Sequence, residues 1–328
     1  MEQITHKTDS PHPEWNESYY FAFFDKKLNI GGVSRIGYKP NKPEGMTFLF
    51  LFFPDGSVAV YHKIEEIIEY SHSLHVGGME HNCISGKKWN YKFQGKMIFL
   101  KNPEDLPKLR EQSKLNLISK AIRKKISKRQ VKLNLDFNPI NKVYEYSEFM
   151  TPESLEIGKK AGDKHWEQIA KIEGELQIGD KIYNIQNTLG QRDHTYGIRD
   201  WTGVGNWLYY VIWFNDTLAI NPATIVLNDG RISTGGFIFK NGKNIPLKSI
   251  KVLNQTFRTD GLLPISSELE IIDYNDEKYI LKAKAGTIIP VPFEDSEGNK
   301  SILVQSFGNF ELDGTSGYGT FETLRKIA

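Results

Sequence analysis

The sequence contains one cysteine, Cys83, so the chain cannot form an internal disulfide. A lone thiol gives no reason to expect an oxidising compartment. Residues 1–15 lack the basic and then apolar pattern of a secretory signal. The longest apolar run, Met46–Pro54, is far shorter than the ~20 residues that a membrane helix needs. We therefore expect a cytoplasmic protein.

Excess charge is also absent. The chain has 42 Lys and Arg against 40 Asp and Glu, a net charge of +2, which gives no electrostatic basis for a dedicated nucleic-acid binder. With 39% hydrophobic and 25% charged residues, the composition is typical of a folded globular protein and excludes a disordered chain. A length of 328 residues indicates two domains, at about 150 residues per domain.

Most of the chain has the pattern of short β-strands. Asp-Gly, Gly-Asp and Asn-Gly pairs separate runs of aromatic and β-branched residues. Four such places predict β-hairpins, at residues 48–62, 173–185, 224–234 and 237–246. Because strands do not alternate with long helices, we predict a mainly β fold of two antiparallel barrel or sandwich domains, covering residues 1–150 and 151–328.

One segment departs from the strand pattern. Pro103–Lys132 carries apolar residues at helical spacing, which predicts one helix near residues 103–130; they are Leu115, Ile118, Ile122 and Ile126. Lys108–Lys132 has ten Lys or Arg and a single acid, Glu111. A basic amphipathic helix can bind an anionic membrane surface weakly. We favour the alternative that its apolar stripe packs against a β domain, because any docked helix has such a stripe.

The densest group of reactive side chains lies in residues 190–201, GQRDHTYGIRDW. In a strand, side chains two apart share a face, so His165 and Glu167, which precede this segment, point the same way. The candidates for acid or base chemistry are Asp193, Asp200, His194, Tyr196, His165 and Glu167. The candidates for substrate binding are Arg192, Arg199, Trp166, Trp201, Trp207 and Tyr209.

This combination of carboxyl groups and aromatic rings suits one kind of chemistry. An apolar pocket raises a carboxyl pKa and leaves an acid able to donate a proton at neutral pH. Aromatic faces stabilise a developing carbocation. Protonation of a double bond could then lead to water addition, proton loss or ring closure. Alternatively, the Arg-Asp pairs only fix turns. We expect at least one of Asp193 and Asp200 to be buried and held by Arg192 or Arg199, with the other nearer a cavity.

No motif for a cofactor or metal stands out. The Gly-Gly pairs lack the spacing of a phosphate-binding loop, and no nucleophile elbow is present. Three histidines and Glu80 lie close in sequence, but their spacing matches no closed zinc pattern; the histidines are His72, His75 and His81. Cys83 is typical of a buried structural thiol. We therefore expect no cofactor and no metal.

The string from Arg192 to Trp201 resembles the signature R-D-x-(S/T)-(W/Y)-G-x-R-D-W of a lipocalin-like superfamily. This superfamily includes carotenoid hydratase (hydroxyneurosporene synthase), tocopherol cyclase and the fungal lipocalin-like Diels–Alderases. Residues 16–20 with 31–40, 165–168 and 317–322 look like further parts of the same two-domain pattern. Tyr196 stands where the family most often has Trp.

The resemblance implies two lipocalin-like β domains, the second carrying the motif. It also implies cofactor-independent chemistry on a hydrophobic, unsaturated isoprenoid, terpenoid, polyketide or lipid-like molecule. Hydratase or dehydratase (lyase) activity, isomerisation and cyclisation are all open, with Asp193 and Asp200 as acid or orienting carboxylates. A non-catalytic carrier or sensor of a hydrophobic ligand is the alternative. In either case the expected partner is a hydrophobic small molecule, and the oligomeric state stays open.

Overall fold

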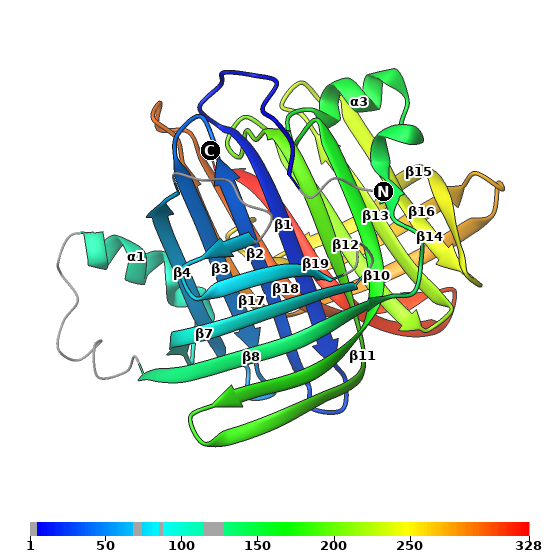
Figure 1. The fold of residues 1–328 in the computed structure, drawn as a ribbon. Helices are drawn as coiled ribbons and strands as arrows, with labels where there is room; N and C mark the ends of the chain where they lie inside the picture. Colours follow the sequence, from blue (N-terminus) through cyan, green and yellow to red (C-terminus); the bar gives the residue numbers. More distant parts are fainter. Residues whose placement is uncertain (1–4, 68–73, 85–87, 115–126, 328) are drawn as a thin grey trace. The chain divides into compact units, whose positions relative to one another are not determined.

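A computed structural model describes residues 5–67, 74–84, 88–114 and 127–327, almost all of them in antiparallel strands (Figure 1). The mainly β prediction is confirmed. The chain forms two compact units, each built from three segments. Unit 1 comprises Met1–Asn102, Leu117–Ile140 and His165–Arg199, and unit 2 comprises Pro103–Asn116, Asn141–Lys164 and Asp200–Ala328.

Unit 1 is a curled antiparallel sheet. Its hydrogen-bonded strands follow the order β4-β3-β2-β1-β11-β10-β8-β7-β6-β5. β4 also pairs with β7, through Val58–Val60, so the two ends of an eight-strand path meet. The strands are β1 (Trp15–Asp25), β2 (Ile30–Lys39), β3 (Glu44–Phe52), β4 (Val58–Glu66), β5 (Leu74–Val76), β6 (Met79–Ile84), β7 (Lys88–Leu100), β8 (Ser127–Pro139), β10 (Lys164–Ile178) and β11 (Lys181–Ile198).

The inner face of this sheet forms the core of unit 1. Strand β8 illustrates why: Val131, Leu133, Leu135 and Phe137 are buried, and the residues between them are exposed. This period of two places every second side chain on the core side. Core residues of β1, such as Phe21 and Phe23, obey the same alternation. Many of the side chains in this interior are aromatic rings.

Unit 2 is a closed barrel of eight strands, β12 to β19, in which β12 pairs with both β13 and β19. The strands are β12 (Asn206–Asn215), β13 (Leu218–Val226), β14 (Ile232–Lys240), β15 (Lys243–Phe257), β16 (Pro264–Asp273), β17 (Lys278–Glu294), β18 (Lys300–Leu312) and β19 (Thr315–Ile327). All four predicted hairpins are present. Asn241 and Gly242, at φ 49° and 83°, form the tight turn between β14 and β15.

The helical elements are short and belong to unit 2. They are η1 (Pro103–Asp105), α1 (Leu106–Lys114), η2 (Tyr146–Glu148) and α3 (Pro152–Gly158), and a short strand β9 (Tyr144–Glu145) precedes η2. α1 contacts β17, and Arg110 Nη1 donates to the Pro292 carbonyl at 3.2 Å. The predicted apolar stripe, Leu115 to Ile126, lies outside the described residues. No described helix is long and apolar enough to cross a membrane.

The two units do not follow a single boundary along the sequence. β11 pairs with β1 over ten residues, from Trp15 opposite Ile198 to Phe24 opposite Leu189. This long-range pairing places β10 and β11 in unit 1, whereas our sequence-based limits, 1–150 and 151–328, assign them to the second domain. The motif therefore belongs to unit 1, except for its last two residues, Asp200 and Trp201.

Candidate functional site

Strands β10 and β11 of unit 1 carry most of the predicted site residues, and β1 pairs with β11 in the same sheet (Figure 1). Tyr20 pairs with Asp193, and Tyr19 pairs with His194. Because alternate side chains of a strand point to opposite faces, Asp193 and His194 lie on different faces. Tyr19 belongs to the core, so His194 faces inward and Asp193 faces outward. Strand alternation thus divides the predicted cluster into an outer and an inner group.

The outer group consists of Asp193, Thr195, His165 and Glu167. The His165 Nδ1 atom lies 2.7 Å from Thr195 Oγ1, and its Nε2 atom lies 2.9 Å from Glu167 Oε1. His165, Glu167 and Asp193 each present a nitrogen or oxygen atom, and these three atoms lie within 4.8 Å of one another. An imidazole and two carboxyl groups therefore meet on one face of two neighbouring strands, as the spacing of His165 and Glu167 indicates.

Burial moves the pKa values of Asp193 and His165 in opposite directions. Asp193 is only 8% exposed, and burial raises its pKa to about 6, with Glu167 adding to the rise. Burial lowers the pKa of His165 to about 4, although 23% of the side chain is exposed. A neutral His165 has one N–H. Because the Glu167 carboxylate can only accept, His165 Nε2–H donates to it and the Thr195 hydroxyl donates to Nδ1.

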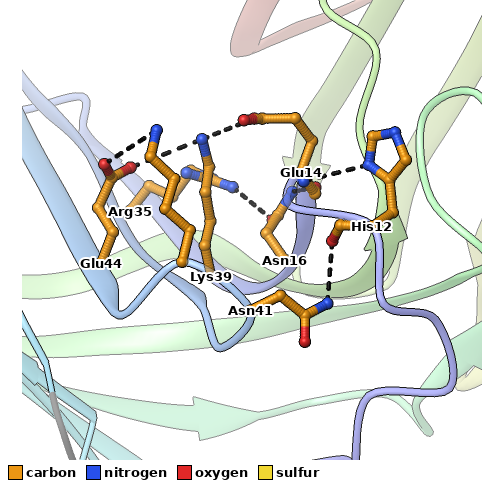
Figure 2. Close-up of polar contacts among 8 residues, drawn as sticks. His12, Glu14, Asn16, Arg35, Lys39, Asn41 and Glu44 are labelled. Atoms are coloured by element: carbon orange, nitrogen blue, oxygen red, sulfur yellow. Dashed lines mark hydrogen bonds and ion pairs between the residues drawn. The ribbon is translucent and has the colours of Figure 1, made fainter.

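Arg35 on β2 adds a buried cation to the outer face. It pairs in register with Tyr20, which in turn pairs with Asp193, so all three lie on the same face. Figure 2 shows Arg35 donating through Nη2 to Asn16 Oδ1, at 3.0 Å. The positive charges of Arg199 and Arg35 oppose the rise in the pKa of Asp193. They would also stabilise negative charge on a bound oxygen atom.

The inner group is centred on Glu17, a buried residue of β1. Glu17 Oε1 lies 2.6 Å from His6 Nδ1 and 2.8 Å from His194 Nε2, and Oε2 accepts from the His6 backbone N–H at 3.0 Å. Burial favours neutral Glu17, but the hydrogen bonds of His194 and His6 outweigh it and lower the pKa. The inner carboxylate is therefore a hydrogen-bond acceptor and not an acid poised near neutral pH.

Aromatic rings surround these imidazoles. Tyr19 stacks on His194 with ring centroids 4.1 Å apart, and Trp166 stacks on it at 4.9 Å. Tyr196 lies against His6 at 4.3 Å. Of the sequence-based candidates, Trp166 and Tyr196 thus lie on the inner face, away from Asp193.

His6 reaches this position because the segment before β1 is tied to the β2–β3 turn. Asn41 Nδ2 donates to the carbonyl of Ser10 at 2.7 Å and to that of His12 at 2.9 Å, and Figure 2 shows the bond to His12. Lys39 pairs with Glu14 nearby, at 2.7 Å. These contacts turn the chain back toward the end of β1, where His6 meets Glu17.

Arg192 also points inward. Its Nε donates to Gln168 Oε1 at 3.1 Å, and its guanidinium lies over the ring of Trp89, 5.3 Å from the centroid. Neighbouring residues of a strand point to opposite faces, so Arg192 does not hold Asp193. The expectation that Arg192 holds this aspartate is therefore not met. The expectation that one aspartate of the motif is buried is met by Asp193.

The last part of the motif belongs to unit 2 and has a structural role. Asp200 Oδ1 accepts from the Gly203 backbone N–H at 2.7 Å, and the Asp200 N–H donates to the Lys160 carbonyl at 3.0 Å. Asp200 thus fixes a turn by accepting from a backbone N–H. Trp201 stacks on Phe293, with ring centroids 4.9 Å apart.

Two further candidates for substrate binding, Trp207 and Tyr209, lie on β12. Leu208 and Tyr210 belong to the core of the unit 2 barrel. Because alternate side chains of a strand point to opposite faces, Trp207 and Tyr209 point away from this core. Trp207 instead donates through Nε1 to Glu322 Oε1 at 3.0 Å. Trp207 and Tyr209 therefore do not line the interior of the unit 2 barrel.

Two groups of described residues have the donor atoms for a divalent ion. They are His6, Glu17 and His194 on the inner side, and His165, Glu167 and Asp193 on the outer side. In both groups an imidazole nitrogen and a carboxylate oxygen already form a direct contact. The expectation that no metal is needed stays a prediction, which chelation tests. His75 and His81 belong to neither group, and His72 lies outside the described residues.

Several residues of these groups are missing from our sequence-based candidates. They are His6, Glu17, Arg35, Asn16 and Gln168. Glu17 and Arg35 had one usable signal, since each is a charged residue inside an apolar, strand-like run. Only the pairing of β1 with β11 brings them to the motif, and no local pattern predicts it.

The fold and the site define a two-unit antiparallel β protein of lipocalin-like architecture. The chain belongs to the family described as a domain of unknown function, DUF7064, whose profile matches residues 2–327. A search of curated proteins by sequence finds no match.

Solved structures share the fold at low sequence identity. A protein from Nitrosomonas europaea described as AttH is 9% identical, with a TM-score of 0.64, 94% of this chain covered and 92% of that one. CghA is 10% identical, with a TM-score of 0.55 and coverages of 96% and 89%. Kievitone hydratase from Nectria haematococca is 11% identical, with a TM-score of 0.54 and coverages of 94% and 87%. At these identities the likeness establishes the fold alone.

Proposed function

We propose that this protein is a cofactor-independent acid–base enzyme that acts on a hydrophobic, unsaturated small molecule by hydration, dehydration, isomerisation or cyclisation. The observation that carries the proposal is the outer group, in which buried Asp193 and neutral His165 lie on one face. Environments that push the pKa values of neighbouring groups apart are typical of an acid and its partner base. A pKa of about 6 for Asp193 leaves about a tenth of it protonated at pH 7.

The proposed chemistry uses these two groups in turn. Asp193 donates its proton to one carbon of a polarised double bond, and the cationic charge develops on the other carbon. A water molecule adds its oxygen there and gives a proton through the Thr195 hydroxyl to His165 Nδ1, while Glu167 orients the ring through Nε2. That proton then returns to Asp193, so the net reaction adds one water. Loss of a proton, or attack by a second double bond, would give isomerisation or cyclisation instead.

The comparisons support this proposal only as analogy. Kievitone hydratase shares the fold, and its name records hydratase chemistry on this architecture. CghA, which also shares it, has been solved with the small molecule Sch210972. We extend from these the expectation of a hydrophobic small-molecule substrate, of isoprenoid, polyketide or lipid-like character.

Isotope incorporation tests the proposal even when the identity of the product is unknown. The full chain is incubated with a panel of unsaturated isoprenoids and polyketides in ²H₂O or H₂¹⁸O, and the substrates are analysed by mass spectrometry. We expect deuterium on carbon, together with ¹⁸O where hydration occurs. In Asp193→Asn the rate of isotope incorporation should fall at least a hundredfold, and the variant should still bind the substrate.

The outcome also separates an enzyme from a carrier. A carrier would bind a member of the panel and incorporate neither isotope, in the wild type as in Asp193→Asn. Asp200→Asn is the matched control, because it makes the same chemical change at a residue that fixes a turn. Equal incorporation by wild type and Asp193→Asn would overturn the assignment of the acid.

A further inference from the structure

The interior of unit 1 contains a second set of polar groups, separate from both groups described above. Ser34 on β2, His81 on β6 and Tyr91 on β7 are 2%, 0% and 1% exposed. The Ser34 hydroxyl, both ring nitrogens of His81 and the Tyr91 hydroxyl have no hydrogen-bond partner among the described residues. Leaving a buried polar group without a partner costs about 1–3 kcal/mol, so three in one core require an explanation.

The three side chains gather around one ring. Phe21 of β1 lies 4.6 Å from His81 and 5.2 Å from Tyr91, measured between ring centroids. Ser34 is the direct partner of Phe21 in the β1–β2 register, so both side chains project from the same face. His81 pairs with Tyr91 between β6 and β7. His81 and Tyr91 therefore enter the interior from paired positions on β6 and β7, and Ser34 enters it from β2 beside Phe21. None of the polar atoms bonds to another.

The surroundings define what could bind there. Phe21 also contacts Trp89 at 5.8 Å and Phe137 at 5.5 Å, so the walls are aromatic. Burial lowers the pKa of His81 to about 3, which keeps the imidazole neutral. Neutral imidazole, phenol and hydroxyl can each donate and accept, which suits an uncharged oxygen atom. A carboxylate would lack a compensating cation among them.

We propose that Ser34, His81 and Tyr91 form a binding site in the interior of unit 1 for an uncharged aromatic or polyunsaturated molecule, with a hydroxyl or carbonyl oxygen held by these three side chains. The site is on the inner face, whereas Asp193 and His165 are on the outer face, so this inference goes beyond the proposed function and stands without it. Eight-stranded barrels have an interior that either side chains fill or one small ligand occupies.

Three probes of matched shape test the site: 2-naphthol, naphthalene and 2-naphthoate, titrated into the full chain by calorimetry. We expect 2-naphthol to bind with one-to-one stoichiometry and more tightly than the other two. Tyr91→Phe and Ser34→Ala each remove only a hydroxyl and should weaken 2-naphthol about fivefold, with naphthalene unchanged. Tyr210→Phe is the matched control, because its hydroxyl already pairs with Ser267 in the other unit, at 3.0 Å.

Other outcomes would overturn the proposal. If 2-naphthol and naphthalene bind equally, or if neither hydroxyl deletion weakens 2-naphthol, the polar groups do not recognise the ligand. If the deletions raise the free energy of unfolding but no probe binds, the hydroxyls are buried without any partner and form no binding site. Asp193→Asn should leave 2-naphthol binding unchanged, so this site and the proposed activity can fail independently.

Discussion

Replacing Asp193 with Asn should stabilise the protein at neutral pH, although Asp193 is the proposed catalytic acid. Its pKa rises from the ordinary 3.8 to about 6 in the folded protein because it is buried. A difference of about two pH units corresponds to about 3 kcal/mol, at 1.36 kcal/mol per unit. This is the free energy by which ionised Asp193 disfavours the folded state, and Asn cannot ionise.

The size of this stabilisation depends on pH. Between about pH 4 and pH 6 the folded chain keeps the Asp193 proton and the unfolded chain has lost it, so stability falls as pH rises. The variant should therefore match the wild type below about pH 4 and exceed it by up to about 3 kcal/mol above pH 6. His165, with its lowered pKa, contributes the opposite slope, but it is present in both proteins.

Urea unfolding of both proteins from pH 4 to pH 8 measures this difference. Asp229→Asn is a control of opposite sign, because hydrogen bonds from Arg231 lower the pKa of this exposed carboxyl. That variant should lose stability at neutral pH. A destabilised Asp193→Asn at pH 7 would mean that Asp193 is ionised and held by a cation, which refutes the reasoning.

Three further predictions concern structure and metal. Asp200→Ala should lower the free energy of unfolding by about 1 kcal/mol, because the Gly203 N–H loses its acceptor, and Asp200→Asn should restore most of it; urea titration measures both. Gly236→Ala should cost about 3 kcal/mol or more, seen as a lower melting temperature, because Gly236 has φ 120° and an added Cβ would lie 1.8 Å from the Asn221 carbonyl oxygen. Exhaustive chelation should leave ligand binding and activity intact, and a loss restored by a divalent ion would contradict this.

Local patterns predicted much of the fold. Turn pairs such as Asn241-Gly242 have the conformations that tight hairpins require, and the alternation in β8 matches its burial. The domain limits could not be predicted in this way. β1 and β11 pair through residues more than 160 positions apart in the sequence. No local pattern in either strand predicts which strand it pairs with.

The sequence predicted which segment contains the site, but not which of its side chains lie on the same face. His165, Glu167 and Asp193 do come together, but His194 and Tyr196 lie on the other face, because a one-residue step in a strand reverses the side chain. Asp200 illustrates a second limit, since a carboxylate that fixes a turn and a catalytic carboxylate look alike in sequence. Ser34, His81 and Tyr91 could not be predicted as a binding site from the sequence, because only the packed core shows that their polar atoms are buried without a hydrogen-bond partner.

Infrared titration measures the protonation of Asp193 directly. The difference spectrum between the wild type and Asp193→Asn isolates the C=O stretch of a protonated Asp193 carboxyl group. We predict that this band is present at pH 5 and disappears with a midpoint near pH 6. A midpoint near or below pH 4 would show that Asp193 is fully ionised at neutral pH, and it would contradict its role as the proton donor.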